Sequence, residues 1–217
     1  EIPSSVTEIG NNSFNGCSSL SEIIIPSSVK SIGSYAFGGC KSLTKIEIPS
    51  SITEIDKYTF NDCSSLKKIV IPSSITSIRS CAFKGCNSLK KIEIPSSVIN
   101  FGQNIFNGVI SLEITGNISY IPDKLFEDCY SLEQIILPSS AVSIGDNSFN
   151  CCTSLAKISF SSNVNSFGCN AFSRCESLKQ ITIPESLTEI KEYSFYRCSS
   201  IKEIIIPSSV TKIGDNA

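Results

Sequence analysis

Residues 25–48, which read IPSSVKSIGSYAFGGCKSLTKIEI, contain every element of the pattern that decides the fold. The same apolar spacing starts again at Ile48, and the central Phe37 recurs in steps of 23 residues, with one step of 20. The recurring residues are Phe14, Phe37, Phe60, Phe83, Phe106, Phe126, Phe149, Phe172 and Phe195. A fixed period of this length indicates a solenoid, in which stacked copies bury one continuous core.

The end of each copy predicts a short strand. Ile46 and Ile48 alternate with Glu47, so the two isoleucines face inward and the glutamate faces outward. Pro49 follows directly, and its missing N–H ends the strand. Strands at the same place in successive copies are expected to form a parallel β-sheet on one face of the solenoid.

The other face is expected to consist of short strands and turns. Ser50 and Ser51 form a turn that leads to a second extended segment, in which Ile52 and Ile55 face inward. We expect residues 36–37 and their equivalents to lie on short helical or 3₁₀ turns, with each phenylalanine filling the space between the two extended edges.

With these residues in place, the sequence resembles the BspA-type leucine-rich repeats. The shared pattern is Leu-x-x-Ile-x-Ile-Pro followed by Ile-Gly, Ala-Phe and Cys, and it covers essentially the whole chain. The resemblance implies the fold class of a leucine-rich repeat solenoid. It also implies a surface or secreted protein involved in adhesion, because family members are typically adhesive proteins of anaerobic bacteria and parasitic protists.

The domain organisation expected from the repeats is a single array over residues 1–217, with about nine copies of 23 residues. One copy, between Phe106 and Phe126, is shortened, and the deletion lies before Leu112. Leu112 matches either the first or the second apolar position of the strand. Because neither end has the polar sequence of a capping repeat, we expect both ends to be truncated.

Composition argues against catalysis. The chain contains no histidine, which removes the commonest general base and the usual partner of a nucleophilic serine or cysteine. Glycine-rich phosphate loops are also absent, and the acidic residues are scattered. We therefore expect no enzymatic activity, no cofactor and no catalytic residue.

Eleven cysteines raise the question of a metal site or disulfides. Eight of them follow a periodic phenylalanine by three residues, namely Cys17, Cys40, Cys63, Cys86, Cys129, Cys152, Cys175 and Cys198. Since no C-x-x-C pair occurs, we expect these to be small buried apolar residues rather than metal ligands. The out-of-phase Cys81, Cys151 and Cys169 are the better candidates for exposed thiols.

The candidate binding surface is the face of the predicted sheet. The outward residue between the two inward isoleucines varies from copy to copy. The outward residue two positions before it forms a second column, which is lysine in the middle copies at Lys45, Lys68 and Lys91. Exposed isoleucine and valine in such a place either mark a contact surface or reflect strand preference alone. The candidate ligand-binding residues are Ile24, Lys45, Glu47, Lys68, Val70, Lys91, Glu93, Ile136, Lys157, Ser159, Thr182 and Ile205.

These features favour a non-catalytic binding module at the cell surface, with a protein ligand such as a host extracellular-matrix or cell-surface protein. A net charge of −2 makes nucleic acid an improbable partner. No apolar run is long enough to cross a membrane, so any anchor lies outside this chain. The alternatives are a cytoplasmic interaction scaffold, a self-associating array, and a polysaccharide binder, although the six tyrosines form no single column.

Overall fold

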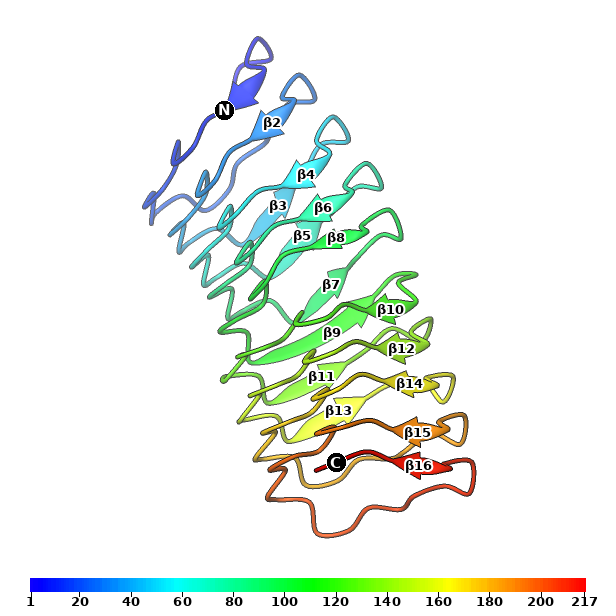
Figure 1. Ribbon diagram of the computed structural model, residues 1–217. Helices are drawn as coiled ribbons and strands as arrows, with labels where there is room; N and C mark the ends of the chain where they lie inside the picture. Colours follow the sequence, from blue (N-terminus) through cyan, green and yellow to red (C-terminus); the bar gives the residue numbers. More distant parts are fainter. The chain divides into compact units, whose positions relative to one another are not determined.

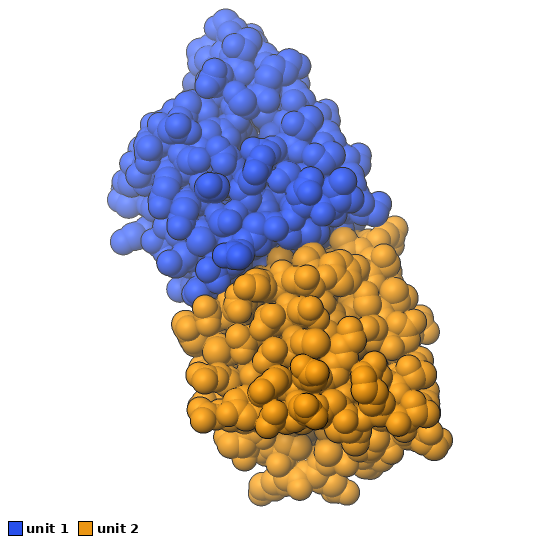
Figure 2. Space-filling model, in the orientation of Figure 1, with its two compact units in different colours: residues 1–109 blue, residues 110–217 orange.

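The computed structural model describes residues 1–217 and contains two compact units, Glu1–Val109 (unit 1) and Ile110–Ala217 (unit 2), coloured blue and orange in Figure 2. Both units consist of stacked repeats of strands and turns, and neither contains a helix. The expectation of a parallel β-solenoid of the leucine-rich type is therefore confirmed.

One row of strands in each unit forms the surface that we call the strand face. In unit 1 it comprises β3 (Lys45–Glu47), β5 (Lys68–Val70) and β7 (Lys91–Glu93), and in unit 2 it comprises β9 (Ser111–Thr115), β11 (Gln134–Ile136) and β13 (Lys157–Ser159). The pairs β3–β5, β9–β11 and β11–β13 are parallel. Residues 21–25, 179–183 and 202–206 occupy the same place in other repeats but form no strand.

A second row of two-residue strands runs in the opposite direction in Figure 1. In unit 1 the row comprises β1 (Glu8–Ile9), β2 (Ser31–Ile32), β4 (Glu54–Ile55), β6 (Ser77–Ile78) and β8 (Asn100–Phe101). In unit 2 it comprises β10 (Tyr120–Ile121), β12 (Ser143–Ile144), β14 (Ser166–Phe167), β15 (Glu189–Ile190) and β16 (Lys212–Ile213). All pairs in this row are parallel, as expected for a stack.

The helical or 3₁₀ turn expected around each phenylalanine is wrong, because the chain forms a series of separate turns there. Tyr35 and Gly39 have φ angles of +56° and +69°, which a right-handed helix cannot contain. The backbone N–H groups also alternate in direction. The N–H of Gly38 donates to the carbonyl of Tyr35 at 3.0 Å, whereas the N–H of Phe37 donates to Thr59 in the next repeat at 2.9 Å. Bonding between repeats thus replaces bonding along a helix.

The phenylalanines form a buried ladder at the centre of each unit. In unit 1 the ring of Phe60 lies 5.7 Å from the rings of both Phe37 and Phe83, at interplanar angles of 5° and 3°. In unit 2 the ring of Phe149 lies 5.0 Å from Phe126 and 5.5 Å from Phe172. All of these side chains are fully buried, so the ladder supplies a large share of the apolar area that each unit removes from water.

Most of the periodic cysteines are structural, as expected. Cys63 is fully buried, and its Sγ donates a hydrogen bond of 3.1 Å to the carbonyl of Phe37 in the preceding repeat. Burial raises the pKa of the Cys63 thiol to about 12, which keeps the group neutral. All eleven cysteines are free. The expectation for the out-of-phase thiols is wrong for Cys81, which is buried at a positive φ of 59°, while the in-phase Cys17 is exposed.

Serine hydroxyls connect successive repeats beside the proline turn. The second serine of the Pro-Ser-Ser motif donates to a backbone carbonyl one repeat earlier, as Ser51 does to Val29 at 2.5 Å and Ser74 does to Ile52 at 2.6 Å. Because these hydroxyls are part-buried, their hydrogen bonds satisfy carbonyls that would otherwise be left unpaired.

The glycine after the second strand is required for packing and not for positive φ. A Cβ atom on Gly102 would lie 2.1 Å from the backbone nitrogen of Ser80 in the preceding repeat, and none of the equivalent glycines has positive φ. The N–H of this glycine donates to a carbonyl one repeat earlier. These bonds, each of 2.8 Å, run from Gly33 to Ile9, Gly102 to Ile78, Gly145 to Ile121, Gly168 to Ile144 and Gly214 to Ile190.

Where another residue replaces this glycine, the second row of strands is interrupted. Asp56 stands at the break between β2 and β4, and Lys191 stands at the break between β14 and β15. Arg79 is the exception, because its N–H still donates to Ile55 at 2.8 Å. The Arg79 guanidinium also bonds to Glu54 in the preceding repeat, with Nη2 and Oε2 separated by 2.6 Å.

The shortened copy lies where unit 1 ends and unit 2 begins. Its strand β9 pairs with β11 so that Leu112 stands opposite Ile135, which assigns Leu112 to the second apolar position and not the first. The N–H of Val109 donates to Phe106 at 3.0 Å, as each periodic cysteine does in its own repeat. The missing residues are therefore those between the cysteine position and the strand.

Candidate functional site

The strand face of unit 1 exposes alternating charged side chains above buried isoleucines. In β3 the side chains of Lys45 and Glu47 are exposed, whereas Ile46 between them is 1% exposed. The neighbouring β5 repeats this arrangement with Lys68 directly opposite Lys45 and Val70 directly opposite Glu47. In β7, Lys91 and Glu93 are likewise exposed on either side of a buried isoleucine. Three lysines of the predicted basic column are thus exposed in unit 1, whereas Lys157 lies in unit 2.

An ion pair joins the two exposed side chains of β3. The Nζ atom of Lys45 lies 2.7 Å from Oε1 of Glu47, and both side chains are more than half exposed. Their hydrogen bond, reinforced by the attraction between the charges, raises the pKa of Lys45 and lowers the pKa of Glu47. Such an exposed pair contributes little to stability, so its charges can be rearranged by a ligand at small cost.

In unit 2 the strand face is less charged. Ile136 of β11 is 50% exposed and stands opposite Glu113 of β9 and Ser159 of β13. Lys157 is exposed and Ser159 half-buried in β13, while Thr182 is exposed in a segment without a strand. The structure therefore places these four predicted residues on one side of unit 2, but only three of them belong to a sheet.

The exposed apolar residues do not form a continuous patch within the strands. Ile24 and Val70 are 67% and 40% exposed, but Glu47 lies between them in the order of repeats. Ile205 is 75% exposed and lies outside any strand. Since single exposed apolar residues are ordinary on protein surfaces, the charges rather than these residues distinguish the strand face of unit 1.

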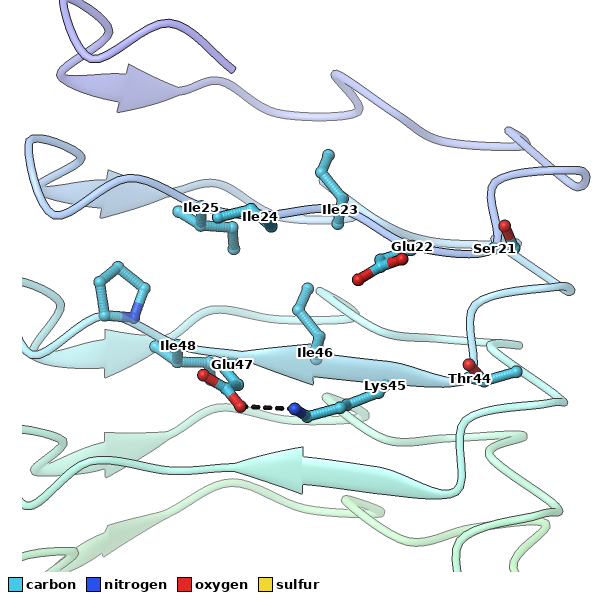
Figure 3. A pocket seen from close by; sticks show the side chains of 11 residues that line it. Ser21, Glu22, Ile23, Ile24, Ile25, Thr44, Lys45, Ile46, Glu47 and Ile48 are labelled. Atoms are coloured by element: carbon cyan, nitrogen blue, oxygen red, sulfur yellow. Dashed lines mark ion pairs between the residues drawn. The ribbon is translucent and has the colours of Figure 1, made fainter. Parts of the chain in front are cut away.

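A cleft interrupts the strand face of unit 1 beside β3. Residues 21–25 form one wall, and Thr44 to Pro49 form the other, and the enclosed volume is about 670 Å³. Figure 3 shows Glu22, Ile23 and Ile24 on one wall and Lys45, Ile46 and Glu47 on the other, with the Lys45–Glu47 ion pair at the edge. A second opening, of about 450 Å³, lies between β2 and β4 and is lined by mostly polar residues including Asp56.

Four of the six tyrosines either stack on one another or hydrogen-bond to a neighbouring carboxylate. Tyr35 and Tyr58, each two residues before a periodic phenylalanine, stack on each other with ring centroids 4.5 Å apart and an interplanar angle of 4°. Their inner faces therefore cover one another, and both residues are half-buried. Tyr120 and Tyr130 instead hydrogen-bond to the nearby carboxylates of Asp123 and Asp128.

The structure holds no group of three cysteine or acidic side chains arranged to bind a metal ion. No helix is long and apolar enough to cross a bilayer. The two features that stand out are therefore surfaces, namely the charged strand face and the cleft beside β3.

The repeat pattern identifies the family. The family model for the BspA type leucine rich repeat region matches in six copies over residues 1–113 and 108–217. The chain belongs to the BspA-type leucine-rich repeat family. BspA-type arrays are repeat proteins whose general role is protein binding and which typically have no catalytic activity. A comparison with curated proteins finds no match.

Solved structures of leucine-rich repeat proteins resemble this BspA-type chain over most of its length. A protein from Bacteroides ovatus shares 26% identity with a TM-score of 0.63, covering 99% of this chain and 68% of its own. The leucine-rich repeat protein of T. pallidum shares 32% identity with a TM-score of 0.53, covering 80% and 72%. A leucine-rich cell surface protein from Faecalibacterium prausnitzii shares 29% identity with a TM-score of 0.49, covering 100% and 78%.

The cleft beside β3 is a feature of this BspA-type chain that the sequence pattern does not indicate. Residues 23–26 carry the same Ile-x-Ile-Pro motif as the other repeats, and this motif predicts a strand that pairs with β3. The outward isoleucine at position 24 gives no signal of the gap, because Ile136 stands at the equivalent outward position within strand β11.

Proposed function

We propose that this chain is a non-catalytic binding module that attaches to a protein ligand at the cell surface through the strand face of unit 1. The observation that carries the proposal is that Lys45, Lys68 and Lys91 are exposed at the same position of β3, β5 and β7, with Lys45 directly opposite Lys68. Their backbone is held by buried isoleucines, so the ammonium groups are presented on a rigid surface. A ligand with an acidic patch fits this column.

The surface location is supported by the family to which the chain belongs. The ligand class proposed with it is a host extracellular-matrix or cell-surface protein. Unit 2 exposes Gln134, Ile136 and Lys157 on a strand face of its own. A mixed surface of this kind is typical of non-obligate interfaces, which are about as apolar as the rest of a protein surface.

The test reverses three charges together. We expect the variant with Lys45→Glu, Lys68→Glu and Lys91→Glu to bind an acidic ligand at least tenfold more weakly, because three attractions become three repulsions. The measurement is biolayer interferometry against a panel of immobilised extracellular-matrix proteins. The matched control reverses Lys30, Lys57 and Lys84, which are exposed in unit 1 but lie off the strand face. Equal losses in both variants, or no binding by the wild type, would contradict the proposal.

Self-association is a second candidate, favoured by an apolar hollow in unit 2. The hollow has a volume of about 350 Å³ and is lined by apolar residues that include Phe195, Ile206 and Ile213. Ile206 is 38% exposed and Ile213 is 60% exposed. Sedimentation velocity over a concentration series tests this candidate. Dimers that grow with concentration and disappear in Ile213→Lys support it, whereas a monomer at the highest concentration removes it.

A further inference from the structure

One edge of β3 has no partner strand. The N–H of Ile48 donates to Val70 at 3.2 Å, and the carbonyl of Thr44 accepts from the N–H of Lys68 at 3.3 Å, so these two groups face β5. Backbone groups alternate in direction along a strand. The N–H and C=O groups of Lys45 and Glu47 therefore point the other way, toward residues 21–25.

Residues 22–25 do not take up these groups. Just before these segments, the N–H of Thr44 donates to the carbonyl of Ser21 at 3.4 Å. Beyond this point the two segments diverge into the cleft of about 670 Å³, and no hydrogen bond joins residues 22–25 to β3. Two donors and two acceptors, spaced as in a β-ladder, thus line one wall of a hollow on the strand face.

The side chains around the cleft define what could occupy it. Ile23 and the buried Ile46 lie on its inner side, where an aliphatic side chain fits (Figure 3). At its mouth are the carboxylates of Glu22 and Glu47 and the ammonium group of Lys45. Because Lys45 already pairs with Glu47, the cleft carries one excess negative charge. An incoming chain with a basic side chain facing outward matches that charge.

We infer that the cleft accepts an extended peptide segment of a protein partner, which pairs with the free edge of β3. The segment alternates aliphatic side chains, which face Ile23 and Ile46, with basic side chains, which face Glu22 and Glu47. Strand addition of this kind obtains affinity from main-chain hydrogen bonds and specificity from alternate side chains. The inference rests on the proposed function and deepens it: a basic segment of the ligand, outside its acidic patch, is recognised as an extended strand.

The probe is the synthetic peptide Ser-Leu-Lys-Lys-Ile-Val-Ile-Pro, labelled with fluorescein and titrated with the protein in fluorescence anisotropy. It reproduces residues 65–72, in which Lys68 and Val70 alternate with Ile69 and Ile71. Two variants of Glu47 distinguish the contribution of its backbone N–H to peptide binding from that of its carboxylate. Glu47→Pro removes the N–H that faces the cleft, and Glu47→Ala keeps that N–H while removing the carboxylate. Neither change removes a hydrogen bond between β3 and β5, and proline is tolerated on such an edge.

We expect saturable binding to the wild type, a loss of at least tenfold for Glu47→Pro, and a change of less than threefold for Glu47→Ala. Tenfold corresponds to about 1.4 kcal/mol, the scale of one lost hydrogen bond with its neighbours disturbed. A charge-reversed peptide, with glutamate in place of both lysines, binds more weakly. Equal losses in the two variants, or no saturable binding of the first peptide, would overturn the inference.

Amide hydrogen exchange on the unaltered protein gives an independent reading that does not depend on how the variants fold. Saturating peptide slows exchange at the Lys45 and Glu47 amides at least tenfold, while the Ile48 amide, already bonded to Val70, keeps its rate. Unchanged rates at both Lys45 and Glu47 would contradict strand addition. If matrix proteins bind but the peptide does not, strand addition fails and the proposed function stands. If neither binds, both fail.

Discussion

We expect Phe60→Ala to lower the free energy of unfolding by roughly 3–5 kcal/mol. Phe60 is fully buried, and its ring lies 5.7 Å from each of the rings of Phe37 and Phe83. Truncation removes the buried ring and leaves a cavity that the stacked repeats cannot close, because their backbones are fixed by hydrogen bonds on both sides. Urea-induced unfolding followed by circular dichroism measures the effect.

Two further variants define what the Phe60 result means. Ile24→Ala removes a large apolar side chain that is 67% exposed, and we expect it to change stability by less than about 0.5 kcal/mol. Phe60→Leu keeps most of the side-chain volume, and we expect its loss of free energy of unfolding to lie between those of Phe60→Ala and Ile24→Ala. A loss below about 1 kcal/mol for Phe60→Ala would show that the ladder is not the main source of stability in unit 1.

The second large effect is expected from Gly102→Ala, which adds one methyl group. The new Cβ would lie 2.1 Å from the backbone nitrogen of Ser80 and 2.6 Å from the carbonyl carbon of Arg79. Neither atom belongs to a flexible side chain, so β6 and β8 must move apart. That movement weakens the 2.8 Å hydrogen bond from Gly102 to Ile78. We expect a loss of about 1–3 kcal/mol in the free energy of unfolding.

Gly10→Ala is the matched control at the same place in the first repeat. There the nearest atom to an added Cβ is Oγ of Ser13 at 3.7 Å, an ordinary contact, and the φ angle of Gly10 is not positive. Because alanine restricts the unfolded chain more than glycine does, Gly10→Ala is expected to raise stability by up to about 1 kcal/mol. Shifts of the two melting midpoints in opposite directions from the wild type support close packing as the reason for the glycine. Shifts in the same direction contradict it.

Much of this fold could be predicted because one pattern recurs nine times. The alternation around Ile46 predicts the strand, its inward side and the outward position of Glu47, and the structure confirms all three. The period of the phenylalanines predicts their ladder, since equivalent residues of stacked repeats must lie side by side.

The short strands of the second row were predicted correctly, including the inward position of Ile55. The helical turns around each phenylalanine were predicted wrongly, because residue preferences do not reveal the direction of N–H groups. Tyr35 and Tyr58 have φ angles of +56° and +58°, although tyrosine rarely adopts such values. The bonds that these turns make to the next repeat compensate for the unfavourable backbone. Such bonds exist only in the stack, so a single repeat sequence cannot indicate them.

One part of the candidate site could be predicted from the sequence and another part could not. The exposed position of Lys45, Lys68 and Lys91 follows from strand alternation and could be predicted. The gap between residues 21–25 and β3 could not, because it depends on whether two repeats with nearly the same motif approach closely enough to pair. Local sequence specifies each strand but not the distance to its neighbour.

The hydrogen bonds that tie the repeats together also determine how this protein can change length. Side-chain bonds between repeats join residues 22, 23, 24, 25 or 26 positions apart, as from Ser51 to Val29, Arg79 to Glu54 and Cys63 to Phe37. Each newly synthesised repeat can therefore dock as soon as it is complete, without waiting for distant sequence. Duplication or loss of one whole 23-residue segment leaves the bonds between periodic residues, such as those of the serines and cysteines, with equivalent partners, so arrays of this kind can lengthen or shorten by recombination without redesign of the core.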